Sequence, residues 1–170
     1  MDFIELAKNR YSCRRLTDRP VEEEKINKIL EAAILSPTAC NYQPYKLWVL
    51  KSEDSLEKYR QITSYHFGAG LVIAVGADPS KAWVRKSDRK NFGDVDAAIA
   101  ATHLMLEAEQ LGLGATWVGS VDTNKMNELF PDMKAYEMIG FFPIGYPSDD
   151  AKPSHLHTTR RELNIAAEFC

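Results

Sequence analysis

Residues 95–120 read VDAAIAATHLMLEAEQLGLGATWVGS, and this stretch decides the fold class. Its first part is rich in alanine and apolar around most of its circumference, a pattern typical of a helix that is buried on several sides. Asp94 or Asp96 can cap the start of this helix, and Gly112 and Gly114 end it. We therefore predict a central helix, followed by a short strand over residues 115–121.

Helices and strands interleave on either side of this central helix. Pro20 opens an amphipathic helix predicted over residues 21–35, because acids crowd its first turn and apolar residues recur at helical spacing. Residues 45–51 and 71–77 predict strands, and the second is apolar on both faces. Further helices are predicted over 3–9, 53–62 and 122–130, and a further strand over 137–147. The irregular connections favour an α+β fold with one central sheet over a doubly wound fold.

Length and charge limit the possible classes of protein. The chain has 170 residues, 45% of them hydrophobic and 26% charged, which predicts one globular domain over residues 1–170. Its net charge of −3 provides no global positive field for nucleic acid or an anionic membrane. No apolar stretch approaches the roughly 20 residues of a membrane helix, and the N-terminus does not resemble a secretory signal. We expect a cytoplasmic protein with neither nucleic-acid nor membrane partners.

The cysteines do not predict a disulfide framework or a metal site. They are Cys13, Cys40 and Cys170, an odd number without CxxC spacing. The alternative is a nucleophilic or redox cysteine that uses a histidine as its base. The histidines are His66, His103, His155 and His157, and none stands at a recognisable catalytic spacing from a cysteine. His103 falls in the central helix, where we expect a core position.

The segment RYSCRR, residues 10–15, is the first candidate binding site. If this segment is extended, Arg10, Ser12 and Arg14 project to one side, because side chains alternate along an extended chain. Guanidinium groups bind phosphate through paired N–H donors, and a hydroxyl completes such a site. The alternative is a solvated loop whose arginines pair with the acids at 22–24.

Three further segments are candidate binding sites. SPTACNYQPY, residues 36–45, offers backbone amides and the Asn41 and Gln43 side chains, which suits a flat polar ring; the alternative is an ordinary turn. GLGATWVGS, residues 112–120, allows close backbone approach to a ligand, but it is not the GxGxxG motif of a Rossmann dinucleotide site. HTTRRE, residues 157–162, carries two arginines that either bind phosphate or form a solvated charge pair.

Together these segments resemble one family, the FMN-dependent nitroreductases, in the same order and over essentially the whole chain. RYSCRR resembles the family's Arg-x-Ser-x-Arg opening, and SPTACNYQP resembles its Pro-Ser/Thr-x-x-Asn-x-Gln-Pro stretch. GLGATWVG is similar to its Gly-Leu-Gly-x-x-Trp segment, and GYP followed by RRE to its Gly-Tyr-Pro and terminal arginine. Tyr45 stands where the family usually has Trp. The tail is also short, whereas members often extend a C-terminal segment across the partner subunit.

The resemblance implies an α+β sandwich with a central, mostly antiparallel sheet flanked by helices, in a homodimer that holds FMN at the subunit interface. It implies that Arg10 and Ser12 contact the ribityl-phosphate, that Arg14 contacts the N1 and C2-carbonyl edge of the flavin, and that one terminal arginine binds the phosphate. The partner subunit would contribute Pro37, Thr38, Ala39 and Asn41. The implied cofactor-binding residues are Arg10, Tyr11, Ser12, Arg14, Pro37, Thr38, Ala39, Asn41, Gln43, Trp117, Val118, Gly119, Arg160 and Arg161.

The resemblance also implies the activity of an NAD(P)H-dependent FMN oxidoreductase. NADH or NADPH would reduce bound FMN, and a nitroaromatic, quinone or similar acceptor would then be reduced at the same flavin in a ping-pong cycle. The amides of Val118 and Gly119 would face N5 and the O4 carbonyl of the flavin. Because FMN carries the chemistry, we predict no catalytic side chain. The alternatives are a specialised flavin reductase or dehalogenase of this fold, a non-catalytic flavin-binding protein, and a thiol-based regulatory protein.

Overall fold

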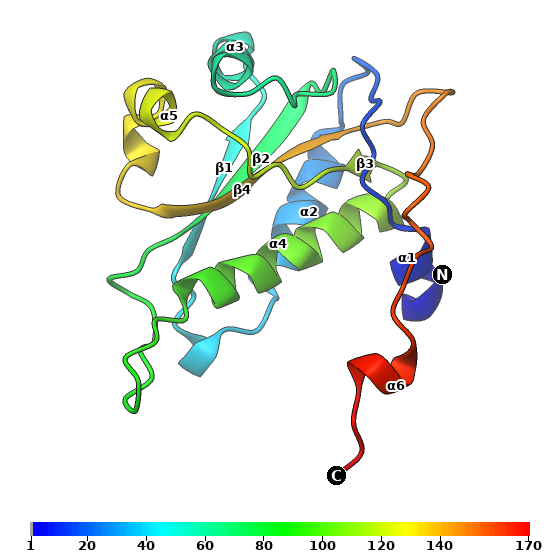
Figure 1. Ribbon diagram of the computed structural model, residues 1–170. Helices are drawn as coiled ribbons and strands as arrows, with labels where there is room; N and C mark the ends of the chain where they lie inside the picture. The colour runs from blue at the N-terminus through cyan, green and yellow to red at the C-terminus, as the bar shows by residue number, and fades with distance from the viewer. Residues whose placement is uncertain (1) are drawn as a thin grey trace.

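Four antiparallel strands form a sheet with the order β1-β2-β4-β3 (Figure 1). The computed structural model describes residues 2–170. The strands are β1 (Tyr45–Leu50), β2 (Leu71–Ala77), β3 (Gly114–Ala115) and β4 (Glu137–Gly145). The predicted α+β fold with an antiparallel central sheet is confirmed.

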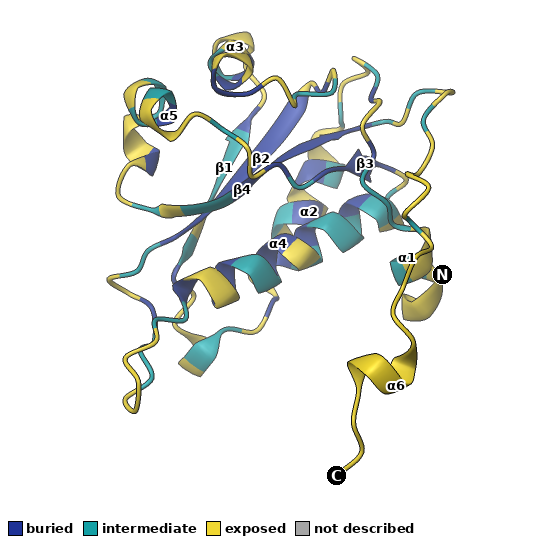
Figure 2. Cartoon of the chain, in the orientation of Figure 1, coloured by how far each residue is buried: buried dark blue, intermediate teal, exposed yellow. Residues whose placement is uncertain are grey.

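Strand β2 lies inside the sheet and is buried on both faces, as its sequence predicts (Figure 2). Leu71, Ile73 and Val75 belong to one hydrophobic cluster, whereas Val72 and Ala74 belong to a second. This division arises because successive side chains of a strand point to opposite faces of the sheet. Both faces of the sheet therefore need a cover of helices.

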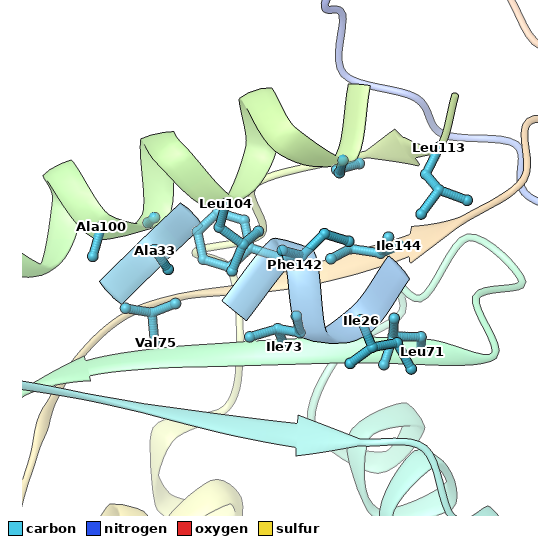
Figure 3. Packing of buried hydrophobic residues seen from close by; sticks show 14 of the residues in the cluster. Ile26, Ala33, Leu71, Ile73, Val75, Ala100, Leu104, Leu113, Phe142 and Ile144 are labelled. Carbon is cyan, nitrogen blue, oxygen red and sulfur yellow. The ribbon is translucent and has the colours of Figure 1, made fainter. Parts of the chain in front are cut away.

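Helices α2 (Glu23–Ile34) and α4 (Gly93–Gln110) cover the first face. Leu104 of α4, Ala33 of α2 and Phe142 of β4 meet in the hydrophobic cluster between them (Figure 3). Four alanines of α4 have no exposed surface, which lets α2 and the sheet approach the α4 backbone closely. Helix α4 is thus the predicted central helix.

Helices α3 (Glu53–Ile62) and α5 (Thr123–Leu129) lie over the second face, where Tyr59 stacks on Phe141 with ring centroids 5.4 Å apart. Burial raises the pKa of the Tyr59 hydroxyl well above its usual value. The remaining elements are α1 (Phe3–Asn9), η1 (Ala39–Asn41), η2 (Pro131–Met133) and α6 (Leu163–Ala166). Within residues 2–170, no helix is long and apolar enough to cross a membrane.

The predicted strand over residues 115–121 is wrong beyond its first residue. Between β3 and α5, the part of the chain that the structure describes makes a single bridge, which joins Val118 to Phe141. The Trp117 indole, which donates to the Ile139 carbonyl oxygen at 3.0 Å, packs against Gly140 where a side chain would otherwise stand. This side-chain contact stands in place of the backbone hydrogen-bond ladder that a strand at 115–121 would form with β4.

Two predictions about α4 are also wrong. Neither Asp94 nor Asp96 caps its start; instead the Asn91 side chain accepts a hydrogen bond from the Gly93 amide at 2.9 Å. His103 is half-buried and lines a shallow pocket between α1, α2 and α4, so it is not a core residue. The reason is that the outer face of α4 is left uncovered by the sheet.

The connector of residues 10–20 runs along β3 and the end of β4. Ser12 forms a parallel bridge with Ala115, and the Thr17 amide donates to the Tyr146 carbonyl oxygen at 2.8 Å. Cys13 and Leu16 are buried in the second cluster. Their burial fixes the connector, and with it the neighbouring arginines that face outward.

We predict that Gly114→Ala lowers the free energy of unfolding by about 1–3 kcal/mol, the usual cost of overpacking. A Cβ at Gly114 would stand 2.6 Å from the Cβ of Cys13, an atom too close to the backbone to move aside. Gly70→Ala is the control, because its Cβ would meet nothing within 4 Å. Urea denaturation of both variants measures the difference. Equal stability of the two would contradict the described packing of the connector.

Candidate functional site

Arg14 stands where three surface pockets adjoin. The polar pocket, about 250 Å³, is lined by Arg10, Tyr11, Ser12, Arg14, Ser154, Leu156, His157 and Arg160. The aromatic pocket, about 240 Å³, is lined by Arg14, Tyr65, Phe67, Thr116, Trp117, Val118, Gly119 and Ser120. The basic pocket, about 560 Å³, is lined by Ser12, Arg14, Arg15, Asp150, Lys152, Pro153, Ser154 and His155. The three together form one groove beside the connector.

The polar pocket brings the two ends of the chain together. Helix α1 ends at Asn9, which leaves Arg10 at the start of the extended connector. The His157 ring lies 2.9 Å from the Lys8 carbonyl oxygen and meets the Tyr11 ring edge-on at 6.1 Å. These contacts place Arg160 in the same pocket as Arg10, whereas Arg161 does not line it.

The electrostatics of the polar pocket favour an anion. Arg10, Arg14 and Arg160 line it, and none of its lining residues is an acid. Burial and a hydrogen bond with Cys13 raise the pKa of the Tyr11 hydroxyl to about 12, so this group stays protonated at neutral pH. A ligand in the pocket therefore meets three guanidinium groups, of which Arg10 also interacts with Glu109 outside the lining, and this excess of positive charge suits a phosphate.

The aromatic pocket is built by the chain that follows β3. The Val118 amide, which is predicted to face a ligand, donates instead to the Phe141 carbonyl oxygen at 2.9 Å. It is therefore not free for a ligand. The Gly119 amide has no partner among residues 2–170, and a Cβ on Gly119 would meet nothing within 4 Å. The Trp117 ring lines the pocket, but its indole N–H is used inside the protein. Gly119 is thus the predicted amide donor that the structure leaves available.

The residues at 37–43, which are predicted to contact the cofactor, line none of the three pockets. The Asp96 carboxylate, 2% exposed, accepts a hydrogen bond from the Ala39 amide at 3.0 Å near the start of α4. Arg10 instead interacts electrostatically with Glu109 near the end of that helix. Burial raises the pKa of Glu109, and the positive charge of Arg10 partly offsets this rise. Asp96 and Glu109 are separated by thirteen residues of α4, about 20 Å at 1.5 Å per residue. A single chain therefore does not bring Arg10 and the residues at 37–43 to the same ligand.

The loop at 38–43 is strained and held by hydrogen bonds. Cys40, Asn41 and Gln43 have φ values of 53°, 56° and 50°, in the left-handed region that non-glycine residues rarely adopt. The Gln43 amide donates to the Thr38 hydroxyl at 3.1 Å, and the Gln43 side chain donates to the Asn41 side-chain oxygen at 3.0 Å. Pro37, next to this loop, is exposed. The conformation of this loop therefore depends on hydrogen bonds such as the one from the Ala39 amide to the Asp96 carboxylate.

The cysteines and histidines do not form a catalytic group. Cys13 is buried, and its thiol donates to the Arg15 carbonyl oxygen at 3.4 Å. Cys40 and Cys170 are exposed. Within residues 2–170, no cluster of three or more metal-ligating side chains is present.

Comparison with known proteins places the chain in a family. The nitroreductase family model matches residues 7–67 and 65–146. The protein belongs to the nitroreductase family. The resemblance inferred from the four sequence segments is therefore confirmed.

Individual members of the nitroreductase family are similar over nearly the whole chain. A nitroreductase family protein from Clostridium difficile is 36% identical, with a TM-score of 0.91 over 99% of this chain and 98% of that one. A Methanothermobacter thermautotrophicus protein with the provisional name NADH dehydrogenase/NAD(P)H nitroreductase is 32% identical, over 88% of this chain and 80% of its own. A provisionally assigned nitroreductase from Desulfovibrio desulfuricans, solved in complex with FMN, is 26% identical, with a TM-score of 0.78 over 96% and 94%.

Sequence reasoning missed several residues that line the groove of this nitroreductase family chain. Phe67 lines the aromatic pocket, and Ser154 and Leu156 line the polar pocket. None of them stands in a motif, so the sequence gives no signal for them. Phe67 has a φ of 53° and accepts a hydrogen bond from the Leu16 amide at 3.2 Å through its carbonyl oxygen, which places it beside the connector.

We predict that Asp96→Ala loosens the strained loop at 38–43, because the half-buried Ala39 amide loses its acceptor. An unsatisfied buried donor costs about 1–3 kcal/mol. Hydrogen exchange of the Ala39 amide should accelerate at least tenfold in Asp96→Ala and much less in Asp96→Asn, which keeps the acceptor oxygen. Unchanged exchange in Asp96→Ala would show that this hydrogen bond does not hold the loop.

Proposed function

We propose that the protein is an FMN-dependent NAD(P)H oxidoreductase that reduces a nitroaromatic, quinone or similar acceptor in a ping-pong cycle. The observation that carries this proposal is the groove itself. Its polar pocket, with three arginines and no acid, is joined at Arg14 to an aromatic pocket with the unpaired Gly119 amide. A ligand with a phosphate at one end and a flat polar ring at the other fits this arrangement.

The polar pocket has the donors that a ribityl-phosphate requires. Arg10 and Arg160 would hold the phosphate through paired N–H donors, and the Ser12 hydroxyl would complete the site. The Tyr11 hydroxyl, with its pKa raised to about 12, adds no negative charge there. The same pocket would favour an anionic ligand over a neutral one, because its three guanidinium groups outnumber the nearby carboxylate of Glu109.

The aromatic pocket has the donors that a flavin ring requires. Arg14 would lie at the ring edge that becomes negative on reduction, and the Gly119 amide would donate to a ring acceptor. The open space over Gly119 leaves room for the ring to approach the backbone. FMN, when bound, supplies the hydride transfer from NADH or NADPH to the acceptor. The chain's residues bind and orient it, and no side chain has to act as nucleophile.

The division of the site supports a homodimer. The loop at 37–43 lies near the opposite end of α4 from Arg10, so a second copy would have to supply it to the flavin bound by the first. Large apolar side chains are exposed as a docking surface needs: Phe3 and Ile4 of α1 are 65% and 60% exposed, and Leu35 after α2 is 73% exposed. The tail, with Leu163 and Ile165 exposed, would pack on the partner. Each subunit would be one domain.

We predict that the purified protein is a yellow dimer with one non-covalent FMN per chain. Heat-released cofactor should comigrate with FMN in chromatography, and sedimentation should give twice the mass of one chain. NADH or NADPH should bleach the flavin, and menadione or nitrofurazone should restore it. A colourless protein, FAD in place of FMN, or a monomer that keeps its flavin would contradict the proposal.

We predict different effects for the two ends of the groove. Arg14→Gln should lower the reduction potential of the bound flavin, because the positive charge at the ring edge favours the more negative reduced state. Arg160→Gln should leave the potential nearly unchanged and weaken FMN binding about tenfold to a hundredfold, because it removes a charge-assisted phosphate contact. Redox titration and FMN titration of both variants measure these effects. An unchanged potential in Arg14→Gln would refute its place at the ring.

A further inference from the structure

Residues 79–92, between β2 and α4, form a hairpin in which positive charge is concentrated. We call this segment the basic hairpin. Its acid is Asp88, and its cations are Lys81, Arg85, Lys86, Arg89 and Lys90. The chain as a whole has a net charge of −3, so the basic hairpin is a local reversal of its charge. The proposed function leaves this segment without a role.

Backbone hydrogen bonds and ring contacts hold the basic hairpin in one conformation. The Arg85 amide donates to the Lys90 carbonyl oxygen at 2.9 Å, and the Phe92 amide donates to the Trp83 carbonyl oxygen at 3.0 Å. The Trp83 and Phe92 rings meet edge-on with their centroids 5.0 Å apart, and Ala82 is buried. The cations of the basic hairpin are therefore carried by an ordered backbone.

Two cations of the basic hairpin are not paired with an acid of the chain. Arg85 forms an ion pair with Asp88. The hydrogen bond from Arg85 lowers the pKa of Asp88, and the charge of Lys90 adds to this effect. Lys86 and Arg89 are exposed, and their side chains make no hydrogen bond or ion pair with residues 2–170. An anion at the basic hairpin therefore meets two unpaired positive charges.

The basic hairpin is joined to the loop at 37–43. The Asp78 amide, at the base of the hairpin, donates to the carbonyl oxygen of Pro44, directly after that loop, at 2.7 Å. The Asn91 side chain accepts from the Gly93 amide at 2.9 Å, which fixes the hairpin to the start of α4. Figure 1 shows the hairpin, in green, at the end of α4 that lies away from both chain termini. A copy that presents this loop to a flavin would therefore present the basic hairpin beside it.

This position limits what the basic hairpin can select. In the proposed dimer it would lie beside the flavin bound to the other subunit, where the acceptor enters once the reductant has left. A carboxylate or sulfonate attached to the acceptor ring lies at a fixed distance from the reacting atoms, so a cation on an ordered backbone can select it. The phosphates of a nicotinamide nucleotide are joined to its ring through several rotatable bonds, so the same cation would select them less.

We propose that the basic hairpin selects acceptors that carry a carboxylate or sulfonate on the ring, chiefly through Lys86 and Arg89. This inference rests on the proposed function, since the acceptor must be reduced at FMN held between two copies. Neither residue lines the groove, so acceptor selectivity can be changed without changing FMN binding. The reaction keeps its balance: NAD(P)H is oxidised to NAD(P)+, and a quinone takes up the two electrons with two protons, one of them from water.

The test compares Lys86→Glu with Lys51→Glu in the FMN-loaded protein. Lys51 is exposed and follows β1 at the end of that strand away from the basic hairpin, and its substitution changes the net charge equally. Its ion pair with the exposed Glu23 is of a kind that contributes little to stability. Stopped-flow oxidation of the reduced protein uses anionic 1,4-naphthoquinone-2-sulfonate and neutral menadione, and separate runs measure reduction by NADH and NADPH. Titration of the oxidised protein with naphthalene-2-sulfonate measures anion binding without turnover.

We expect Lys86→Glu to lower the rate constant for the quinone sulfonate, and the affinity for naphthalene-2-sulfonate, about threefold to tenfold, because an attractive charge becomes repulsive at an exposed site. The rates with menadione, NADH and NADPH and the FMN content should stay unchanged, and Lys51→Glu should change none of these quantities. Salt should slow the quinone sulfonate more in the wild-type protein than in Lys86→Glu, because the screening length falls from about 30 Å at 0.01 M to about 10 Å at 0.1 M.

The outcomes separate this inference from the proposed function. A colourless protein, or a reduced flavin that menadione does not reoxidise, would refute the proposed function and the inference with it. A yellow, active dimer in which Lys86→Glu and Lys51→Glu slow the quinone sulfonate equally, or not at all, would keep the proposed function and overturn the inference. A loss confined to reduction by NADH or NADPH would assign the basic hairpin to the reductant, which also overturns it.

Discussion

The close packing of helix α4 against α2 and the sheet is the constraint on which the rest of the structure depends. Four alanines of α4 have no exposed surface, so its backbone lies close to the neighbouring elements. A helix packed in this way is a rigid element, because a protein core tolerates little change of volume. The Ala39 amide bonds to α4 near its start, and Arg10 interacts electrostatically with Glu109 near its end. The length of α4 thus sets the distance between the loop at 37–43 and Arg10.

This separation bears on how the chain would hold the proposed cofactor. The three pockets beside the connector are open to solvent. A second copy that approaches with its own loop at 37–43 would cover the open side of the groove. The strained, hydrogen-bonded form of that loop means that little conformational entropy would be lost on binding, since the loop is already ordered. The buried Asp96 carboxylate is what makes this order possible.

The groove also shows how a chain of net negative charge can form a site for anions. Lysines and arginines elsewhere pair with acids on their own helices, as Lys28 does with Glu24 and Lys58 with Asp54. In the groove, Arg14 and Lys152 have no such pairs in residues 2–170. The positive potential therefore comes from a local excess of cations over acids, with Asp150 paired to Arg15, rather than from the overall composition.

The sequence by itself determined the fold class and the family. The alanine-rich helix, the strand that is apolar on both faces and the four segments from RYSCRR to RRE are local patterns, each set by neighbours within a few residues. For the same reason the sequence could name most of the candidate site residues. It could not give the contact of Trp117 with Gly140, because this contact joins two segments that are distant in the sequence.

Only the tertiary structure decided how the candidate residues are grouped. It placed Arg160 with Arg10, separated the loop at 37–43 from both, and left the Gly119 amide free while the Val118 amide bonds to Phe141. It also formed the basic pocket from the connector and residues 150–155, which no motif indicated. These outcomes depend on which surfaces pack together over long stretches of chain. Side-chain packing and backbone hydrogen bonds between distant segments determine them, and no local pattern encodes either.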